Sequence, residues 1–366
     1  METQRIYLIG AGIIARQHAA TIRRFPRSEQ VVLSVADPNK QALAVFTEQY
    51  PHAHAFEDAQ TMLAEPALEN DIVIVATPPV THYELASAAL ATGRHVLCEK
   101  PLALDRAQAR QMLATARTHG RVLGCCSVRF LHWPPAEAAR RLLQEDVLGP
   151  LYHVRFLCVE QRNRPGIEYQ PGTAWFLDRT KSGGGTLMDR APYEFGVLND
   201  LLKPTHIEVL SAWLANPITA GMSPASERDV EQHAGASLRY HLADGTTCML
   251  TYERASGTHS EAQSCVEITG LKGSIRWIWP HGFISNTLTH TYDCNGRVES
   301  KTISFPRPDP EDLRFGEKPL YYFYQYLQHQ PSSAIVNEQA LFNFSCIRAI
   351  YDCALSEQPQ TVVLGE

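Results

Sequence analysis

A glycine-containing turn near the start of the chain constrains its fold most strongly. Gly10-x-Gly12-x-x-Ala15 follows a strand-like run, residues 5–9, and opens a helical stretch. Such glycines either close a strand–helix turn or also let the backbone approach a pyrophosphate, which a helix N-terminus binds through its free N–H groups and positive dipole end. The position after the first strand favours a dinucleotide site. The residues expected at the cofactor in this turn are Gly10, Gly12, Ile13 and Ile14.

Short β-rich runs alternate with longer helical runs over the first third of the chain. The stretch Ile72-Val73-Ile74-Val75 is continuously apolar, as expected for a strand that helices cover on both faces. This alternation predicts an α/β Rossmann domain with a doubly wound parallel sheet. The expected strands are 5–9, 31–36, 71–76, 95–98 and 122–126, and the expected helices are 14–25, 40–50, 81–92 and 104–118.

The pattern changes after Phe130, where strand-like runs become dominant. Asp244-Gly245 lies between two of these runs and is a hairpin signal, because glycine tolerates the positive φ of such turns. We expect an α+β domain with an open, mostly antiparallel sheet. Its expected strands are 151–159, 207–214, 235–242, 246–252, 264–269 and 273–279, and its expected helices are 136–144, 320–329 and 338–355.

A chain of 366 residues is longer than one hydrophobic core usually supports. We therefore expect a cofactor-binding domain over 1–126 and a substrate-binding and oligomerisation domain over 127–366. The expected helix at about 338–355 could pack back on the first domain.

Composition argues against several classes of partner and location. The net charge of −6 argues against a nucleic-acid partner, which usually needs a basic face. No apolar run reaches the roughly 18 residues of a membrane helix, and the first residues lack a signal-peptide pattern. The nine cysteines are an odd number without metal-like spacing, which indicates reduced thiols and no metal site. These observations predict a cytoplasmic protein with no membrane or nucleic-acid partner.

Asp37 follows the second expected strand and bears on the choice of cofactor. A carboxylate there accepts the ribose hydroxyls of NAD and repels the 2′-phosphate of NADP. The alternative is an Asp-Pro turn starter, and nearby Lys40 could soften the repulsion, so NADP stays possible. We expect NAD.

Two further segments follow expected strands, at the sheet edge where open α/β sheets bind ligands. The first contains Thr77 and Pro78, with His82 as either a cofactor contact or a helix-start residue. The second is Cys98-Glu99-Lys100-Pro101. A lysine there can polarise an alcohol or carbonyl oxygen, whereas the alternative is a surface Glu–Lys pair.

Taken together, these motifs resemble the glucose–fructose oxidoreductase/inositol dehydrogenase (Gfo/Idh/MocA) family, whose most specific mark here is Gly93-x-His95-Val96-x-x-Glu99-Lys100-Pro101. The resemblance implies a Rossmann domain followed by an open-sheet domain, Glu99 at the cofactor, and Lys100 at both nicotinamide and substrate. It also implies a cis Lys100–Pro101 bond and a homodimer or homotetramer.

A third family signature is matched at Ser182-Gly183-Gly184-Gly185-Thr186-Leu187-Met188-Asp189. Where the inositol-dehydrogenase-like branch has an acid/base histidine, this chain has Tyr193, and it also departs at Ala191 and Gly196. The resemblance therefore points to a tyrosine-type branch.

Tyr193 and Asp189 each have a functional and a structural interpretation. A phenol, with a pKa near about 10, needs a neighbouring cation to act as a base, and Lys100 could supply it. Tyr193 could instead be a core tyrosine. Asp189 could orient Lys100 or bind substrate hydroxyls, or it could merely cap a helix.

Weaker substrate candidates are aromatic or basic. Trp175 could stack on a sugar ring, and arginines would suit a carboxylated or phosphorylated substrate. Ordinary core or surface roles are the alternatives. The arginines are Arg129, Arg162, Arg164 and Arg179.

The sequence thus predicts an NAD(P)-dependent oxidoreductase that acts on a secondary alcohol or ketone of a sugar, cyclitol or related polyol, with Lys100 and Tyr193 as proton relay. Two alternatives remain: an NAD-retaining glycosidase with transient redox chemistry, and a non-catalytic dinucleotide-binding sensor.

Overall fold

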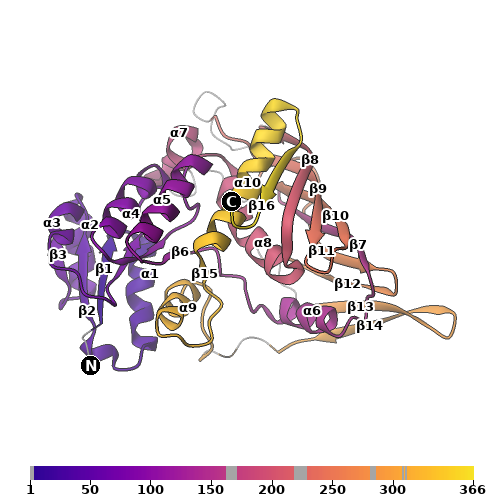
Figure 1. Cartoon of the computed structure of the whole chain (residues 1–366), viewed down its shortest axis with the longest axis horizontal. Coiled ribbons are helices and arrows are strands. Elements are labelled where there is room, and N and C mark those ends of the chain that lie inside the picture. The colour runs from indigo at the N-terminus through magenta and orange to yellow at the C-terminus, as the bar shows by residue number, and fades with distance from the viewer. Residues whose placement is uncertain (1–3, 162–170, 218–228, 281–285, 307–308, 310) are drawn as a thin grey trace. The chain divides into compact units, whose positions relative to one another are not determined.

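The computed structural model describes residues 4–161, 171–217, 229–280, 286–306, 309 and 311–366 (Figure 1). The contacts divide the chain into two units. The first unit comprises Met1–Arg129 and Leu313–Phe344, and the second comprises Phe130–Asp312 and Ser345–Glu366. Segment 313–344, which the sequence pattern assigns to the second domain, groups with the first unit, because helix α9 adds its apolar side to that core.

The first unit is built on a seven-stranded sheet with the order β15-β6-β5-β4-β1-β2-β3. All neighbouring strands are parallel except β15, which pairs with β6 in the antiparallel sense. The predicted doubly wound sheet is therefore confirmed, with one antiparallel edge strand added. Its strands are β1 (Arg5–Ile9), β2 (Val32–Ala36), β3 (His54–Phe56), β4 (Ile72–Val75), β5 (His95–Cys98), β6 (Leu123–Cys125) and β15 (Ile335–Val336).

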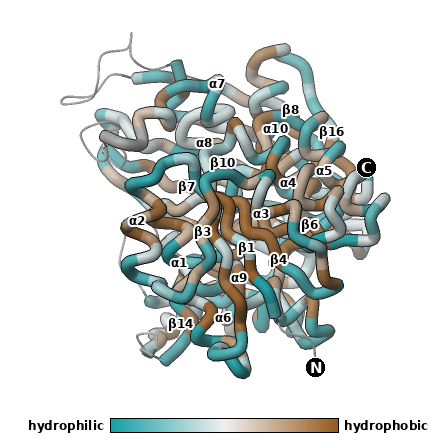
Figure 2. Tube along the Cα trace, turned by 90° about the vertical axis from the view of Figure 1, so that its left-hand side faces the viewer, coloured by the Kyte–Doolittle hydropathy of each residue, from teal (hydrophilic) through white to brown (hydrophobic). Residues whose placement is uncertain are grey.

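Helices cover both faces of this sheet, as its continuously apolar strands require. On one face, α1 and α2 contribute Ala15 and Phe46 to a core that Leu320 and Phe323 of α9 complete. Helices α4 and α5 pack together on the other face (Figure 1). Figure 2 shows the hydrophobic residues concentrated along β1 and β4. The helices are α1 (Ile13–Thr21), α2 (Lys40–Gln49), α3 (Ala59–Leu63), α4 (His82–Ala91), α5 (Arg106–Thr118) and α9 (Lys318–Leu327).

The second unit is built on a nine-stranded sheet with the order β14-β13-β12-β11-β7-β10-β9-β8-β16. Only the β7–β10 pair is parallel within this described sheet, so the predicted open, mostly antiparallel sheet is confirmed. Gly245 has a φ of +83° in the turn that joins β9 to β10, as predicted for a hairpin. The strands are β7 (Leu151–Val159), β8 (Pro204–Ala215), β9 (His233–Leu242), β10 (Thr247–Ala255), β11 (Gln263–Gly270), β12 (Gly273–Trp277), β13 (Thr287–Cys294), β14 (Arg297–Ser304) and β16 (Gln360–Val363).

Helix α8 packs against β9 and β10 of this sheet and also contacts α6. Nearly all of its side chains are buried, including polar ones. A helix buried on several sides is held in one position, so the side chains that it carries are held too. The helices of the second unit are α6 (Pro134–Gln144), α7 (Arg179–Ser182) and α8 (Thr186–Leu202), and α10 (Asn337–Ser356) spans the boundary between the units.

Candidate functional site

The glycine turn follows β1 at the carboxyl edge of the parallel sheet. Gly10 has a φ of +104°, and a Cβ there would lie 2.5 Å from the carbonyl oxygen of Ala76, so only glycine fits. Gly12 is the N-cap residue of α1 and has no capping side chain. A Cβ at Gly12 would meet no atom within 4 Å, so packing does not explain this glycine. An open glycine at a helix N-terminus fits a bound pyrophosphate.

Two of the predicted cofactor residues lie in the first turn of α1, and Asp37 lies beside it. Ile13 is 55% exposed, unusually high for an isoleucine, and Ile14 is partly buried. The Asp37 carboxylate accepts hydrogen bonds from the backbone N–H of Ala11 (2.8 Å) and of Asn39 (2.8 Å). Asp37 thereby links the glycine turn to the start of α2, and each of its oxygens retains a lone pair.

His82 connects two of the strand-end loops. It is fully buried, with Nε2 2.9 Å from the carbonyl oxygen of Thr77 and Nδ1 2.8 Å from that of Pro101. Burial lowers the pKa of His82, and a neutral ring donates to only one of these carbonyls at a time. Thr77 also accepts a hydrogen bond from the Thr81 hydroxyl (2.8 Å), and Pro78 is exposed. The structure therefore places His82 between the loops that follow β4 and β5.

Glu99 forms the centre of a buried charged network next to Lys100. Its Oε1 accepts a hydrogen bond from Arg129 Nη2 (3.0 Å) and lies 3.0 Å from His18 Nε2. Its Oε2 accepts a hydrogen bond from the backbone N–H of Lys100 (3.2 Å). Burial raises the pKa of Glu99, but Arg129 and His18 outweigh burial and hold that pKa well below its usual range. Glu99 is therefore a carboxylate at neutral pH.

His18, Glu99 and Cys126 present ligand-type atoms within 4.8 Å of one another, the spacing of a metal site. Two observations argue against a cation among them. Arg129 already places a positive charge on the Glu99 carboxylate, and burial holds the pKa of the Cys126 thiol well above its usual range. Cys126 would have to be a thiolate to bind a metal ion, and the ion would have to displace the Arg129 guanidinium from Glu99. The cluster is better explained as an ion-pair network that supports Lys100.

Lys100 therefore lies in a loop that is fixed on both sides. Glu99 binds its backbone N–H, and His82 lies against the carbonyl of the next residue, Pro101. The Lys100–Pro101 bond is cis, as the family resemblance implies. The Lys100 side chain is partly exposed, in contrast to the buried Glu99. A partly exposed amine on a fixed loop can contact a ligand.

In the second unit, a buried glutamate organises the glycine run before α8. Glu231 accepts hydrogen bonds from the backbone N–H of Gly185 (2.8 Å), the backbone N–H of Leu187 (3.0 Å) and the hydroxyl of Tyr351 (2.7 Å). A Cβ at Gly185 would lie 1.8 Å from the carbonyl oxygen of Glu231. The signature glycine therefore allows Glu231 to cap the helix, and sequence reasoning missed this residue because no motif marks it.

Asp189 and Tyr193 lie one turn apart on α8, so they share one face of the helix. Asp189 is 8% exposed and pairs with Arg190 Nε (3.2 Å). Tyr193 is 5% exposed, and its ring packs edge-on against Phe130, with the ring centroids 5.3 Å apart. Their positions are fixed by the capped helix start, which brings together two of the three predicted catalytic residues within one unit.

A second buried network anchors the middle of α8. Glu194, adjacent to Tyr193, accepts a hydrogen bond from the hydroxyl of Tyr252 and lies 3.6 Å from Arg254 Nε. Arg254 is fully buried on β10 and also pairs with Glu160 (3.3 Å). These contacts tie the helix to the sheet beside the residue predicted to move a proton.

The weaker substrate candidates fall in different surroundings. Arg129 is bound to Glu99 in the first unit. Trp175 is partly buried and stacks on Phe176, with the ring centroids 3.7 Å apart, whereas the side chain of Arg179 is exposed. Arg162 and Arg164 lie outside the described residues.

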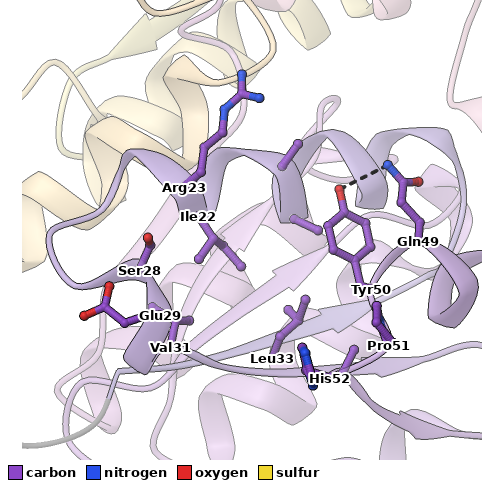
Figure 3. Close-up of a pocket in the computed structure, with 13 residues that line it drawn as sticks. Ile22, Arg23, Ser28, Glu29, Val31, Leu33, Gln49, Tyr50, Pro51 and His52 are labelled. Carbon is purple, nitrogen blue, oxygen red and sulfur yellow. Dashed lines mark hydrogen bonds between the residues drawn. The ribbon is translucent and has the colours of Figure 1, made fainter.

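A hollow in the first unit lies away from the predicted cofactor residues (Figure 3). It is lined by the last part of α1, the start of β2 and the end of α2, and is therefore at the edge of the sheet opposite the glycine turn. The side chains that surround it include Arg23, Glu29 and Tyr50, and Gln49 Nε2 donates to the Tyr50 hydroxyl (3.4 Å). No residue predicted for the site lines it.

The fold and the strand-end loops define a two-domain oxidoreductase with an NAD-binding Rossmann domain. Residues 4–126 match the oxidoreductase family with an NAD-binding Rossmann fold, Gfo/Idh/MocA, and residues 136–276 match a C-terminal domain of the same family. A putative UDP-kanosamine synthase oxidoreductase subunit of Amycolatopsis mediterranei (strain S699) is 31% identical over 294 residues, which cover 77% of both chains. The chain belongs to the Gfo/Idh/MocA family.

Two further proteins show the range of similarity. D-glucoside 3-dehydrogenase of Escherichia coli (strain K12) is 33% identical over 186 residues, half of each chain. The structure of levoglucosan dehydrogenase in complex with NADH and levoglucosan superimposes with a TM-score of 0.75 over the full length of both chains, at 18% identity, which supports the fold. Among the described residues, no helix has the length and apolarity needed to cross a membrane.

Proposed function

We propose that this protein is an NAD-dependent dehydrogenase or reductase that interconverts a secondary alcohol and a ketone of a sugar, cyclitol or related polyol, with Lys100 and Tyr193 as proton relay. The observation that carries the proposal is the arrangement of α8, where Asp189 and Tyr193 share one face of a helix whose start is fixed by Glu231. A fixed carboxylate and phenol one turn apart suit a hydroxylated substrate better than a structural role alone.

The residues present fit NAD. The glycine turn and the first turn of α1, Gly10 to Ile14, would hold the pyrophosphate, and Asp37 would accept the ribose hydroxyls. Thr77, Pro78, Glu99 and Lys100 lie in the loops after β4 and β5, at the same edge. NAD, when bound, supplies a hydride acceptor. Asp37 retains free lone pairs on a fixed carboxylate, so it favours NAD over NADP through repulsion of a 2′-phosphate.

Side chains of this protein would accept the proton that the substrate hydroxyl loses. An alcohol carbon releases a hydride readily only as its oxygen loses a proton, and that proton needs a base. A phenol becomes a base near neutral pH when a cation stabilises the phenolate, and Lys100 supplies a cation. In the proposed step, the phenolate of Tyr193, stabilised by the ammonium of Lys100, takes the proton from the substrate hydroxyl and becomes a neutral phenol, as the carbon that bears this oxygen gives up its hydride and the C–O bond becomes a carbonyl. Asp189 accepts a hydrogen bond from a substrate hydroxyl.

The choice of substrate class rests on the named relatives. D-glucoside 3-dehydrogenase, an oxidoreductase subunit of UDP-kanosamine synthase and levoglucosan dehydrogenase all have names that refer to sugars or sugar derivatives. Sugar rings carry carbons with secondary hydroxyls. We therefore propose such a carbon as the reacting centre here, in a branch of the family in which tyrosine replaces histidine.

The test is Tyr193→Phe, which removes the acidic hydroxyl and preserves the ring. We expect kcat to fall by roughly 10²–10⁴-fold with little change in the Kd for NAD. Tyr152→Phe is the matched control, because Tyr152 is 52% exposed on β7 of the same unit. A Tyr193→Phe variant that turns over as fast as Tyr152→Phe would place the proton relay elsewhere.

A steady gain of reduced nicotinamide with added polyol also separates a dehydrogenase from an NAD-retaining glycosidase, which recycles its cofactor.

A further inference from the structure

A small polar pocket lies beside the start of α8, within the second unit. Its polar lining consists of Thr186, Asp189, Gln232 and Ser256, and Phe176 and Leu177 form its apolar wall. With a volume of about 20 Å³, it admits a group about the size of one water molecule. The pocket can therefore receive one functional group of a larger molecule.

The backbone of Gln232 is hydrogen-bonded to residues at the ends of two strands, β8 and β10. Its N–H donates to the carbonyl oxygen of Ala215 at the end of β8 (3.0 Å), and its carbonyl accepts from the N–H of Ser256 just after β10 (2.8 Å). The preceding residue, Glu231, binds the start of α8 through its side chain and its carbonyl oxygen. Gln232 therefore has a fixed position next to the helix that carries Asp189.

The polar groups that line the pocket differ in their hydrogen-bond partners. The hydroxyls of Thr186 and Ser256 bind each other, and Asp189 pairs with Arg190. Gln232 as a whole residue is only 4% exposed, and it lines the pocket, where its side-chain amide makes no hydrogen bond to another described residue. Buried amides are normally bonded, since burying one without a partner is unfavourable. The Gln232 amide is therefore available to bond to a group that enters the pocket, either a water molecule or part of a ligand.

We propose that Gln232 is a substrate-recognition residue, which together with Asp189 forms a subsite for one substrate hydroxyl. The inference rests on the proposed function and adds a specificity residue to it. A hydroxyl donates one hydrogen bond and accepts others, so it can donate to the Asp189 carboxylate while accepting from the Gln232 amide. A methylene or an ether oxygen lacks the donor. The subsite therefore selects polyols with a free hydroxyl beside the reacting carbon over the deoxy or O-methyl analogues.

Three variants test the proposal. Gln232→Leu keeps a similar size and removes the hydrogen bonds, and Gln232→Glu keeps the shape and removes the donor. Gln263→Leu is the control, because Gln263 is exposed at the start of β11 in the same unit. Turnover is measured with the best substrate from a polyol panel and with its deoxy and O-methyl analogues. Thermal unfolding and the Kd for NAD are measured for each protein.

We expect Gln232→Leu to raise KM for the hydroxylated substrate by about tenfold or more, with kcat changed less than about threefold. Values for the analogues, the Kd for NAD and the Tm should match those of Gln263→Leu. Equal losses on all substrates, or no loss on any, would overturn the proposal and indicate that the pocket holds only a structural water.

Direct binding distinguishes this proposal from the proposed function. Saturation-transfer NMR with the polyol and its analogues needs no turnover. If no polyol is oxidised but the wild-type protein still prefers the hydroxylated ligand and Gln232→Leu does not, the proposed reaction fails and the subsite stands. If turnover occurs and this preference is unchanged in Gln232→Leu, the reaction stands and the subsite fails.

Discussion

The buried pair of Glu99 and Arg129 allows a quantitative prediction. Arg129→Met removes the guanidinium and keeps most of the aliphatic side chain, so it leaves a carboxylate that is 8% exposed without its main cation. Breaking a buried pair by removing one partner costs about 3–5 kcal/mol. The lower end applies here, since Arg129 is 17% exposed and His18 still lies on the carboxylate. We expect a loss of about 3 kcal/mol, or about 6–12 °C in the Tm for a domain of this size.

The sign of the pH dependence follows from the lowered pKa of Glu99. Its ordinary value is 4.5, and in the folded protein Arg129 and His18 outweigh the effect of burial and hold it lower. The unfolded chain therefore takes up the proton first, so the pair stabilises the fold above pH 4.5 and loses this contribution as the pH falls through the folded pKa. The deficit of Arg129→Met should be largest near neutral pH and shrink in acid, where Glu99 becomes neutral.

The assay is urea-induced unfolding of wild type and variants at several pH values. The matched control is Arg117→Met, because Arg117 pairs with Glu338 at 2.7 Å with side chains 58% and 43% exposed, where such a pair contributes only about 0–1 kcal/mol. Glu99→Gln combined with Arg129→Met should recover part of the loss, since no unpaired charge remains. If Arg129→Met costs no more than Arg117→Met at neutral pH, burial does not govern the strength of this network.

Two other substitutions test the loops and the helix start. His82→Phe removes the buried N–H that donates to the carbonyl oxygen of either Thr77 or Pro101, at a cost of about 1–3 kcal/mol in chemical unfolding. It should also weaken NAD binding in calorimetry more than the control His119→Phe does, because His119 is exposed at the end of α5. Equal Kd values would show that His82 does not order these loops. Gly185→Ala places a Cβ 1.8 Å from the Glu231 carbonyl oxygen, so it should lower the Tm strongly. The control Gly245→Ala should lower the Tm less, because a Cβ there meets nothing within 4 Å. Equal shifts in Tm would contradict the role given to the glycine run.

The sequence predicts the first unit well because its local signals agree with one another. The apolar run of β4 and the glycine turn after β1 each determine their own structure, so the predicted and observed strands differ by one residue or less at each end. Strand β3 was missed because it has only three residues and is mostly exposed. The hairpin of β13 and β14 was missed for a similar reason, since every residue of β14 but Ile303 is exposed, and it shows no apolar alternation.

The site was predicted only where a motif marks it. Helix α8 was not predicted, because Pro192 and Gly196 lower its helix propensity and tertiary packing compensates for them. Glu231 and Gln232 have no local signature, because their roles arise from the contact between the end of a sheet and the start of a helix. His18 lies 81 positions from Glu99, and Arg129 lies 30 positions away, so only the folded sheet brings them together.

We propose above all that this protein interconverts a polyol and a ketone with NAD, with Lys100 and Tyr193 as proton relay. The most direct measurement is the initial rate of reduced-nicotinamide formation with aldoses, inositols and uronates, for the wild type and for Lys100→Met, together with the Kd for NAD. We predict turnover of at least one member of the panel by the wild type, and a rate lower by about 10²-fold or more in Lys100→Met with the cofactor still bound. A panel that gives no turnover, or a Lys100→Met variant as fast as the wild type, would contradict the claim.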